Sequence, residues 1–312
     1  MRILVTGGNG SVGRDLLPAL LDRGDEVVVL DREVSTLRAS GGHRRLELIE
    51  GAVEDRAAAE RAIRGADAVV HLAWSFADDL RTLLLTDLLG EQSLLELARA
   101  GGVKRFVYAS SAVVYGKPVR SSIGEDHPLL ALQARKPAYA LAKEMGEKMA
   151  LLAGQGGGPP PTILRFWWAF GSEIPGRHLR EMLRTAAAGE PVRVPEGCGG
   201  SFLSADDLAQ GLLLALGEPA AAGGIFNLQS AYLAWEEVAR MAVAATGGKA
   251  VVEPVPAAQW TGAPFLADAW RLDDGLAREK LGYRPRRDPA GLRLQLQEAI
   301  RRTWEAARPV RQ

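Results

Sequence analysis

The chain has 312 residues, of which 47% are hydrophobic and 24% charged, a composition typical of a globular protein with one large α/β unit or two domains. Because 38 basic residues balance 38 acidic ones, no net charge is available to attract a nucleic acid or an anionic membrane. Cys198 is the only cysteine, which excludes an intrachain disulfide and a thiolate cluster, and we predict no metal site. No apolar run approaches the roughly 18 residues of a membrane span, and no leader precedes the first strand, so we expect a cytoplasmic protein.

Short apolar runs alternate with longer helical patterns over the first 166 residues, which predicts a parallel sheet flanked by helices. The runs are apolar throughout rather than alternating, as expected for strands covered on both faces. The expected strands span 3–6, 26–30, 46–49, 68–72, 105–109 and 162–166. The expected helices lie near 11–23, 55–64, 79–101 and 138–153.

Proline and glycine accumulate after residue 166, which indicates a smaller lobe interleaved with the first. Segments 205–216 and 223–228 are expected to return to the main sheet as a helix and a strand. We therefore predict a doubly wound α/β fold with a main domain over 1–166 plus about 202–228. The smaller C-terminal lobe is expected over 167–201 and 229–312.

The first predicted strand leads into a glycine-rich turn, "VTGGNGSVG", with glycines at every third position: Gly7, Gly10 and Gly13. Glycines at such positions permit a tight turn, let the backbone approach a pyrophosphate, and let the helix pack on the strand. The N–H groups at the start of the following helix then hold the phosphates. The turn therefore predicts a dinucleotide site.

Asp31 ends the second predicted strand and is the candidate ligand for the cofactor ribose. A carboxylate at this position binds the ribose hydroxyls of NAD and repels the 2′-phosphate of NADP. Asp31 therefore predicts NAD as the cofactor. Arg32, the next residue, is able to bind a phosphate, so NADP remains as the less favoured alternative. A structural alternative is that Asp31 only caps a helix starting near Glu33.

Tyr139 and Lys143 lie four positions apart in the helical pattern "PAYALAKEMGEKM". They share one face of the helix, with Cβ atoms about 5–6 Å apart. An exposed tyrosine and a solvated lysine produce the same spacing, since short motifs recur by chance. The rest of the chain has to decide between these two interpretations.

Taken together, these segments resemble the extended short-chain dehydrogenase/reductase family, whose members are often called NAD-dependent epimerases/dehydratases. The matching segments follow the order of the family: "VTGGNGSVG" near the start, "VVHLAW" at 69–74, "FVYASSAVVYG" at 106–116, "YALAK" at 139–143, "ILRFWWAFG" at 163–171 and "FLSADDLA" at 202–209. The resemblance implies a Rossmann-type NAD-binding domain with a C-terminal substrate lobe. It also implies a catalytic set of Ser111, Tyr139 and Lys143, in which Lys143 binds the nicotinamide ribose as well.

The expected chemistry follows from these residue types. A phenol with a pKa near 10 is a poor base at neutral pH, and both Lys143 and the positive nicotinamide ring favour the phenolate. Tyr139 then removes the proton of a substrate hydroxyl while hydride leaves for the nicotinamide, or does the reverse for a ketone. Ser111 is expected to hydrogen-bond the same oxygen.

Further contacts are predicted around this set. For the cofactor they are Ser11, Val12, Val53, Leu72 and Ala73, and for the substrate, beside Ser111, they are Trp74, Ala112, Trp167 and Trp168. Aromatic side chains suit an apolar or ring-shaped substrate and also stack on sugars. Core packing is the alternative interpretation, above all for Trp167.

Several departures from the family pattern concern the substrate. Trp168 stands where nucleotide-sugar enzymes usually keep an asparagine, and Gly200 and Ser201 stand where they often keep an arginine and an aspartate. No arginine occurs around 263–266, where a second clamp is expected. Because bidentate arginine is the natural ligand of a diphosphate, these departures argue against a nucleotide sugar. The absence of an acidic pair after Ser111 also disfavours a sugar 4,6-dehydratase.

Two enzymatic hypotheses remain. One is a net dehydrogenase or ketoreductase of a carbinol that carries no nucleotide, and the other is an NDP-sugar 4-epimerase with tightly bound, recycled NAD. A dinucleotide-binding regulator is the weaker alternative, because it has no need of an intact Ser-Tyr-Lys set.

The predicted partners are a small-molecule substrate and a second copy of the chain, with neither nucleic acid nor membrane. The family resemblance points to a homodimer in which the helices near 79–101 and 138–153 form a four-helix bundle. The apolar faces expected to pair are Leu88, Leu94, Leu95 and Leu97 on the first helix, and Leu141, Met145, Met149 and Leu152 on the second.

Overall fold

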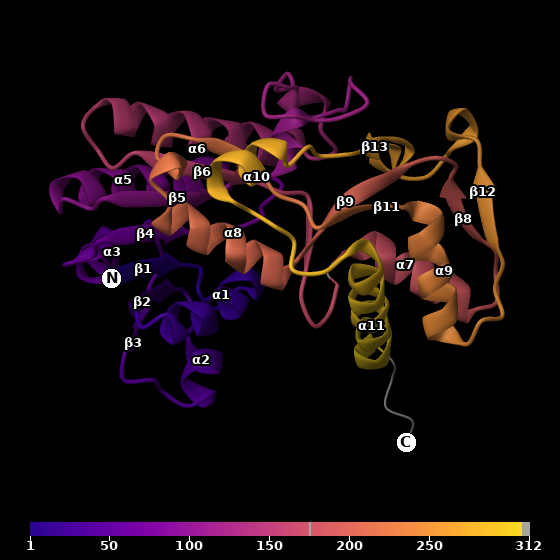
Figure 1. Ribbon diagram of the computed structural model, residues 1–312, viewed down its shortest axis with the longest axis horizontal. Helices are drawn as coiled ribbons and strands as arrows, with labels where there is room; N and C mark the ends of the chain where they lie inside the picture. The colour runs from indigo at the N-terminus through magenta and orange to yellow at the C-terminus, as the bar shows by residue number, and fades with distance from the viewer. Residues whose placement is uncertain (175, 308–312) are drawn as a thin grey trace.

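The computed structural model describes residues 1–174 and 176–307, and its centre is a seven-stranded, wholly parallel sheet (Figure 1). The strand order is β10-β6-β5-β4-β1-β2-β3. The chain runs outward from β1 in one direction and from β4 in the other, so the order reverses between these two neighbours. Ligands of open α/β sheets bind at such a switch point. The strands are β1 (Arg2–Thr6), β2 (Glu26–Asp31), β3 (Leu46–Glu50), β4 (Ala68–His71), β5 (Arg105–Ala109), β6 (Pro161–Arg165) and β10 (Ile225–Asn227).

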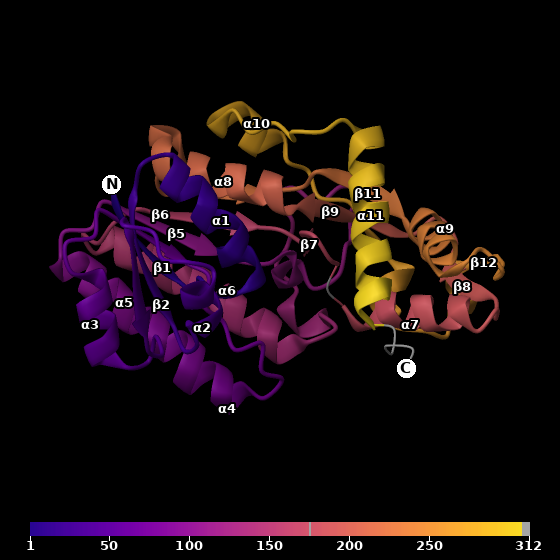
Figure 2. The ribbon, with the colours of Figure 1, turned by 90° about the horizontal axis from the view of Figure 1, so that it is seen from below.

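Helices cover both faces of this sheet, which is why its strands are apolar at nearly every position (Figure 2). On β1, Ile3 and Val5 pack into one layer and Leu4 into the other, all fully buried. The first layer contains α1 (Ser11–Asp22), α2 (Ser35–Ala39), α8 (Ala205–Gly217) and α10 (Gly275–Leu281). The second contains α3 (Arg56–Ile63), α5 (Leu89–Ala100) and α6 (Pro137–Gln155). The predicted α/β class, strands and return to the sheet are confirmed.

The helix predicted over 79–101 is interrupted. A short turn, α4 (Leu80–Thr82), passes into the π-helical segment η1 (Leu83–Leu88) before α5 begins. Single π turns inside α-helices occur often at functional sites. Here the π turn contains Asp87, whose carboxylate accepts hydrogen bonds from the backbone N–H (2.7 Å) and the hydroxyl (2.5 Å) of Ser75 after β4.

The apolar face predicted for this helix is wrong. Leu88, Leu94 and Leu95 are buried between the helix and the sheet, because the side chains that face the sheet must be apolar. Leu97 is partly buried against the same core, and the exposed leucines of η1 and α5 are others: Leu84, Leu85 and Leu89. On the neighbouring α6, the expected exposure holds for Leu141, Met145 and Leu152, whereas Met149 is partly buried against the core.

A second lobe lies beside the main sheet (Figure 1). Its central strand β9 (Gly199–Ser204) pairs with β7 (Trp168–Phe170), β11 (Ala231–Ala234) and β13 (Ala269–Trp270), and β8 (Val192–Pro195) pairs with β12 (Val252–Val255). Three helices enclose its core: α7 (Arg177–Ala187), α9 (Trp235–Thr246) and α11 (Pro289–Ala307).

The predicted extent of this lobe differs from the structure at α10, which packs on the main sheet through Ala277 and Leu281. The last residues assigned to the lobe, 308–312, lie outside the described residues. None of the helices in the described part of the chain has the length and apolarity that crossing a bilayer requires.

Candidate active site

The turn between β1 and α1 and the start of α1 leave no room for a side chain at Gly7 or at Gly13. Gly7 has φ +70°, and a Cβ placed on it would lie 2.6 Å from the backbone nitrogen of Ala73. A Cβ on Gly13 would lie 2.5 Å from the carbonyl oxygen of Gly8, so only glycine lets α1 pack this close. No side chain of the described residues caps α1 at Gly10, which leaves its first N–H groups to a ligand.

A cavity of about 280 Å³ extends from this turn to the end of β2. Seven of the predicted cofactor residues line it: Gly7, Gly10, Asp31, Arg32, Val53, Leu72 and Ala73. Eight residues that sequence reasoning missed lie there too: Asn9, Leu30, Gly51, Glu54, Ser75, Phe76, Thr86 and Asp87. Of these, only Asp87 gave a signal in the sequence, as a carboxylate within the apolar stretch "LLLTDLLG".

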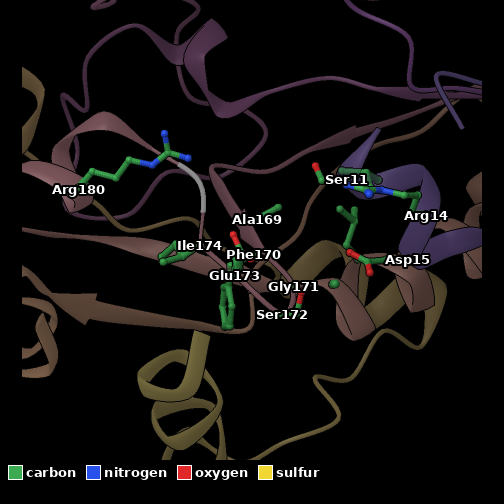
Figure 3. Close-up of a pocket in the computed structure, with 13 residues that line it drawn as sticks. Ser11, Arg14, Asp15, Ala169, Phe170, Gly171, Ser172, Glu173, Ile174 and Arg180 are labelled. Carbon is green, nitrogen blue, oxygen red and sulfur yellow. The ribbon is translucent and has the colours of Figure 1, made fainter. Parts of the chain in front are cut away.

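Ser11 and Val12 line a different cavity, of about 500 Å³, and Figure 3 shows Ser11 in it. It lies between the start of α1, with Arg14 and Asp15, and the loop that follows β7. Arg180 extends toward it from α7. Nine of the predicted cofactor residues are therefore divided between these two cavities, whereas Gly13, Tyr139 and Lys143 line neither of them.

Asp31 organises the cofactor cavity rather than a helix end. Its carboxylate accepts hydrogen bonds from the backbone N–H groups of Asn9 (2.9 Å) and Glu33 (3.2 Å). Helix α2 starts only at Ser35 and receives no side-chain cap. The capping alternative is therefore wrong, because Asp31 ties the glycine turn to the end of β2 at the edge where a ribose would lie.

Tyr139 and Ser111 meet at the carboxyl end of β5. Ser111 follows this strand and accepts a hydrogen bond from Val113 N–H (3.2 Å), which starts the 3-10 turn η2 (Ala112–Tyr115). Tyr139 lies in the first turn of α6, and its phenol interacts with the Ser111 hydroxyl. Phe76 stacks on the Tyr139 ring, with a centroid distance of 5.8 Å, while Trp74 meets its edge at 6.3 Å.

Lys143 is buried beneath Tyr139. Its Nζ donates a hydrogen bond to the carbonyl of Ala109 at the end of β5 (2.9 Å) and lies 3.6 Å from the centroid of a Trp74 ring. Trp74 thus covers the lysine and lines the cofactor cavity. The prediction of Trp74 as a substrate contact is not met, because its side chain does not line the cavity at Tyr139.

The pKa values of the pair differ from the expected ones. Burial raises the pKa of Tyr139 above its ordinary value, although the interaction with Ser111 lowers it. Burial also lowers the pKa of Lys143 to about 7, against the charges of Glu91, Asp87 and Glu147, which raise it. The fold alone therefore does not provide the low Tyr139 pKa expected from the sequence.

Glu91 on α5 is a buried carboxylate close to this lysine. It is fully buried, and neither of its oxygens has a hydrogen-bond partner among the described residues. A Cβ on Gly146 would lie 2.5 Å from Glu91 Oε2 and 2.4 Å from the Tyr108 hydroxyl, so both groups face the same turn of α6. Burial raises the pKa of Glu91 to about 8, with the charge of Lys143 opposing.

Tyr139 opens into a third cavity, of about 380 Å³, between the main sheet and the second lobe. Ser111, Trp167 and Trp168 line it as predicted, whereas Ala112 is buried and does not. Phe76, which has φ +55°, lines both this cavity and the one with Asp31. Two further lining residues, Val113 and Gly116, belong to the segment "FVYASSAVVYG" but were not predicted as contacts. The remaining walls lie outside the quoted motifs: Arg135, Lys136, Gly176, Arg177, His178, Phe265 and Trp270.

The positions that would carry a diphosphate clamp are filled by contacts of the second lobe. A Cβ on Gly200 would lie 1.6 Å from the Trp167 ring, which stacks on Trp270 with centroids 5.9 Å apart and planes 7° apart. Ser201 Oγ donates to Gln229 Oε1 (2.7 Å) and accepts from the backbone N–H of Leu272 (3.0 Å). Gly200 thus leaves space for the stacked rings of Trp167 and Trp270, which form an aromatic wall.

Comparison with known proteins places this arrangement in a family. The sequence profile of the NAD dependent epimerase/dehydratase family matches residues 3–228. A UDP-glucose 4-epimerase of Azospirillum brasilense is 29% identical over 321 residues, which cover 92% of this chain and 88% of that protein. A 3 beta-hydroxysteroid dehydrogenase/Delta 5-->4-isomerase of Mycobacterium tuberculosis is 34% identical over 160 residues, 48% of this chain and 42% of that protein.

A solved structure shares the whole architecture. A short-chain dehydrogenase/reductase superfamily protein from Agrobacterium tumefaciens, with bound NAD, superimposes with a TM-score of 0.79 and 28% identity over 98% of both chains. The cavity between the glycine turn and Asp31 fits the same dinucleotide, since backbone N–H groups and a carboxylate lie where phosphates and ribose require them. The chain therefore belongs to the NAD-dependent epimerase/dehydratase family, a class of NAD-dependent enzymes among the extended short-chain dehydrogenases/reductases.

Proposed function

We propose that the protein transfers hydride between a carbinol or ketone and NAD, with Tyr139 as the acid/base. One observation carries this proposal. The Tyr139 phenol opens into a cavity with the Ser111 hydroxyl beside it, and Lys143 is fixed below by the carbonyl of Ala109. This is the arrangement in which one substrate oxygen receives a hydrogen bond and exchanges a proton at the same time.

Each residue has a distinct task. NAD, when bound, supplies the hydride acceptor and a positive ring that favours the phenolate. Tyr139 takes or gives the hydroxyl proton, and Ser111 holds the oxygen in line. Lys143 contributes a positive charge below the phenol only while its amine is protonated. Because its pKa is about 7, the fraction of protonated Lys143 changes with pH in the neutral range.

The substrate proposed here carries no nucleotide. Trp167 occupies the space above Gly200, and Phe265 stands in the segment where a second clamp arginine is expected. An NDP-sugar 4-epimerase with recycled NAD is the second candidate, supported by the length over which the Azospirillum UDP-glucose 4-epimerase matches.

The nucleotide content of the purified protein separates the two candidates. We expect a cofactor site that loads and releases NAD, and stoichiometric formation of NADH and ketone when NAD and a panel of ring-bearing carbinols are supplied. Mass spectrometry of the native protein and absorbance of NADH measure these two quantities. Retained NAD together with conversion of UDP-glucose into its 4-epimer would instead establish the epimerase.

We further propose NAD rather than NADP as the cofactor, and Asp31 tests this. NAD should bind at least about tenfold tighter, a difference of about 1.4 kcal/mol. Asp31→Asn should narrow the gap because it removes the charge that repels a 2′-phosphate and keeps the shape of the side chain. Fluorescence titration with each cofactor measures both affinities, with Asp22→Asn at the far end of α1 as the control. Equal affinities in the unaltered protein would refute the preference.

Glu91 should set the pH range of activity. Burial holds the pKa of Glu91 at about 8, so its carboxyl is ionised only in part at the pH where Lys143, with a pKa of about 7, titrates. This partial negative charge raises the pKa of Lys143, so Glu91→Gln should move the alkaline limb of the pH–rate profile down by less than about 1 unit. The other ionisable groups facing this pair, Asp87, Tyr108, Glu147 and His71, are unchanged in the variant.

Glu96→Gln is the matched control, because Glu96 lies on the same helix but is exposed and bonded to Arg56 and Gln92. It should leave the profile in place. A Glu91→Gln enzyme whose rate falls equally at every pH would show that Glu91 only packs.

We also propose a homodimer formed through η1, α5 and α6. Two neighbouring exposed sets support it: Leu84, Leu85 and Leu89, with Leu141, Met145 and Leu152. A dimer mass is expected in light scattering at micromolar concentration, and Met145→Glu should shift it toward the monomer. A monomer mass for the unaltered protein would exclude this arrangement.

The remaining assignments rest on sequence and topology together. We infer a cytoplasmic location from the composition. We also infer that residues 1–166 with about 202–228 bind NAD, while the second lobe supplies the substrate walls.

A further inference from the structure

The charge balance of the cavity at Tyr139 indicates what the substrate carries. Among the described residues that line it, three are cations, Arg135, Lys136 and Arg177, and neither aspartate nor glutamate is present. Lys136 is paired with Asp78 (2.6 Å), and Arg177 is paired with Glu181 (3.1 Å). Arg135 has no carboxylate within ion-pair distance in the described part of the chain.

Arg135 is nevertheless held in a defined orientation. Its guanidinium carbon lies 4.8 Å from the centroid of the Phe265 ring, and Nη1 lies 2.7 Å from His178 Nε2. Burial and the charge of Arg135 lower the pKa of His178, which favours a neutral imidazole that accepts the hydrogen bond. One edge and one face of the guanidinium are thus engaged, and its other N–H donors remain for a ligand.

The cavity around this guanidinium is small and aromatic. Its volume of about 380 Å³ is at the lower end of the range for small-molecule pockets, roughly 300–1,000 Å³. Trp167, Trp168, Phe265 and Trp270 provide flat apolar walls. A compact ring fits between these walls, and a planar anion matches the two parallel N–H groups of a guanidinium. Because the Arg135 side chain is already oriented, it loses less conformational freedom when the anion binds.

We infer that the substrate is a compact, ring-bearing carbinol or ketone with an anionic substituent, and that Arg135 binds this substituent while Tyr139 meets the carbinol oxygen. The inference rests on the proposed function for the position of the reacting oxygen. A carboxylate is the best match to the planar guanidinium, and a phosphate ester presents the same charge and acceptor atoms. The test therefore includes both.

Binding without turnover tests the inference separately from the chemistry. The Tyr139→Phe protein is titrated with para-(hydroxyethyl)benzoate, with its methyl ester and with the corresponding phenyl phosphate, and quenching of tryptophan fluorescence reports occupancy of the cavity. The carboxylate should bind at least about tenfold tighter than the ester. Arg135→Gln should remove this advantage and leave the affinity for the ester unchanged, and Arg135→Lys should restore only part of it.

Two matched variants control for unspecific attraction. Lys136→Gln and Arg177→Gln make the same charge change on the same rim, at side chains that already have partners, and should alter carboxylate binding less than about threefold. Because Arg135 is exposed and contacts only the edge of the second lobe's core, through Phe265, circular dichroism should show unchanged folding in Arg135→Gln.

The outcomes distinguish this inference from the proposed function. Equal affinity for acid and ester, no effect of Arg135→Gln, or no binding of either anion overturns the inference, even if neutral carbinols are oxidised. Preferred phosphate binding assigns the substituent to a phosphate ester and supports it. Tighter binding of UDP-glucose than of any small anion overturns the assignment to a compact substrate. Arg135-dependent anion binding without NADH formation from any carbinol leaves the inference standing and refutes the proposed function.

Discussion

Replacing Tyr139 by phenylalanine is expected to lower turnover about 10²–10⁴-fold, the usual contribution of a positioned proton transfer. The variant loses one hydroxyl from a helix that otherwise packs unchanged, so its free energy of unfolding should change by no more than about 1 kcal/mol. Affinity for NAD should persist, because the glycine turn and Asp31 lie in a cavity that the phenol does not line. Steady-state kinetics and cofactor titration measure the two effects.

Two neighbouring variants sharpen this prediction. Ser111→Ala should lose turnover with little change in NAD affinity. Lys143→Met should lose turnover and also bind NAD more weakly, because the lysine is assigned both the phenolate and the nicotinamide ribose. Near-full activity of Tyr139→Phe on a substrate of the unaltered protein would mean that another group carries the proton.

Replacing Glu147 by alanine is expected to destabilise the fold by about 3–5 kcal/mol, because it leaves the Arg165 guanidinium buried without its counter-charge. Arg165 Nε and Nη2 donate to the two oxygens of Glu147 at 2.8 and 2.5 Å, and the side chains are 3% and 2% exposed. Ser110 donates a third hydrogen bond to the same carboxylate at 2.5 Å. The pair therefore fixes α6, and with it Tyr139, on strands β5 and β6.

Urea denaturation followed by circular dichroism measures this loss. Lys148→Ala is the control on the same helix, since Lys148 is exposed and should matter little. The double variant Glu147→Leu with Arg165→Met removes both charges and should recover most of the stability, because the cost comes from the unpaired charge rather than from the missing bonds. Equal destabilisation of the single and double variants would contradict that account of the cost.

The sequence predicts the main sheet well because its signals are local. Strands such as "VVVL" are apolar at every position only when both faces are covered, and a glycine turn directly after the first strand is typical of a dinucleotide site. The family resemblance, rather than any local signal, predicts that Ser111, Tyr139 and Lys143 act together. In the structure each lies at the carboxyl edge of β5 or on the helix beside it.

What the sequence did not reveal depends on contacts across the chain. Phe265 and His178 belong to segments without a motif, and they reach the cavity only because the second lobe packs against Arg135, just before α6. The leucines exposed on η1 and α5 are not the ones expected from the sequence, because packing against the sheet decides which side of a helix is buried. The pKa of Tyr139 depends on burial, which no spacing of residues reports.

The contact between Trp167 and Gly200 constrains how this protein can change over evolutionary time. An indole ring fills the volume that any side chain at residue 200 would need, so the effect of a substitution at either site depends on the residue present at the other. An arginine at 200 is harmful while Trp167 remains, and becomes tolerable only after the ring is replaced by something small. In a lineage with this aromatic wall, Trp167 must therefore be replaced before an arginine at residue 200 can serve as a diphosphate ligand. The order of these two substitutions then determines whether the change is possible.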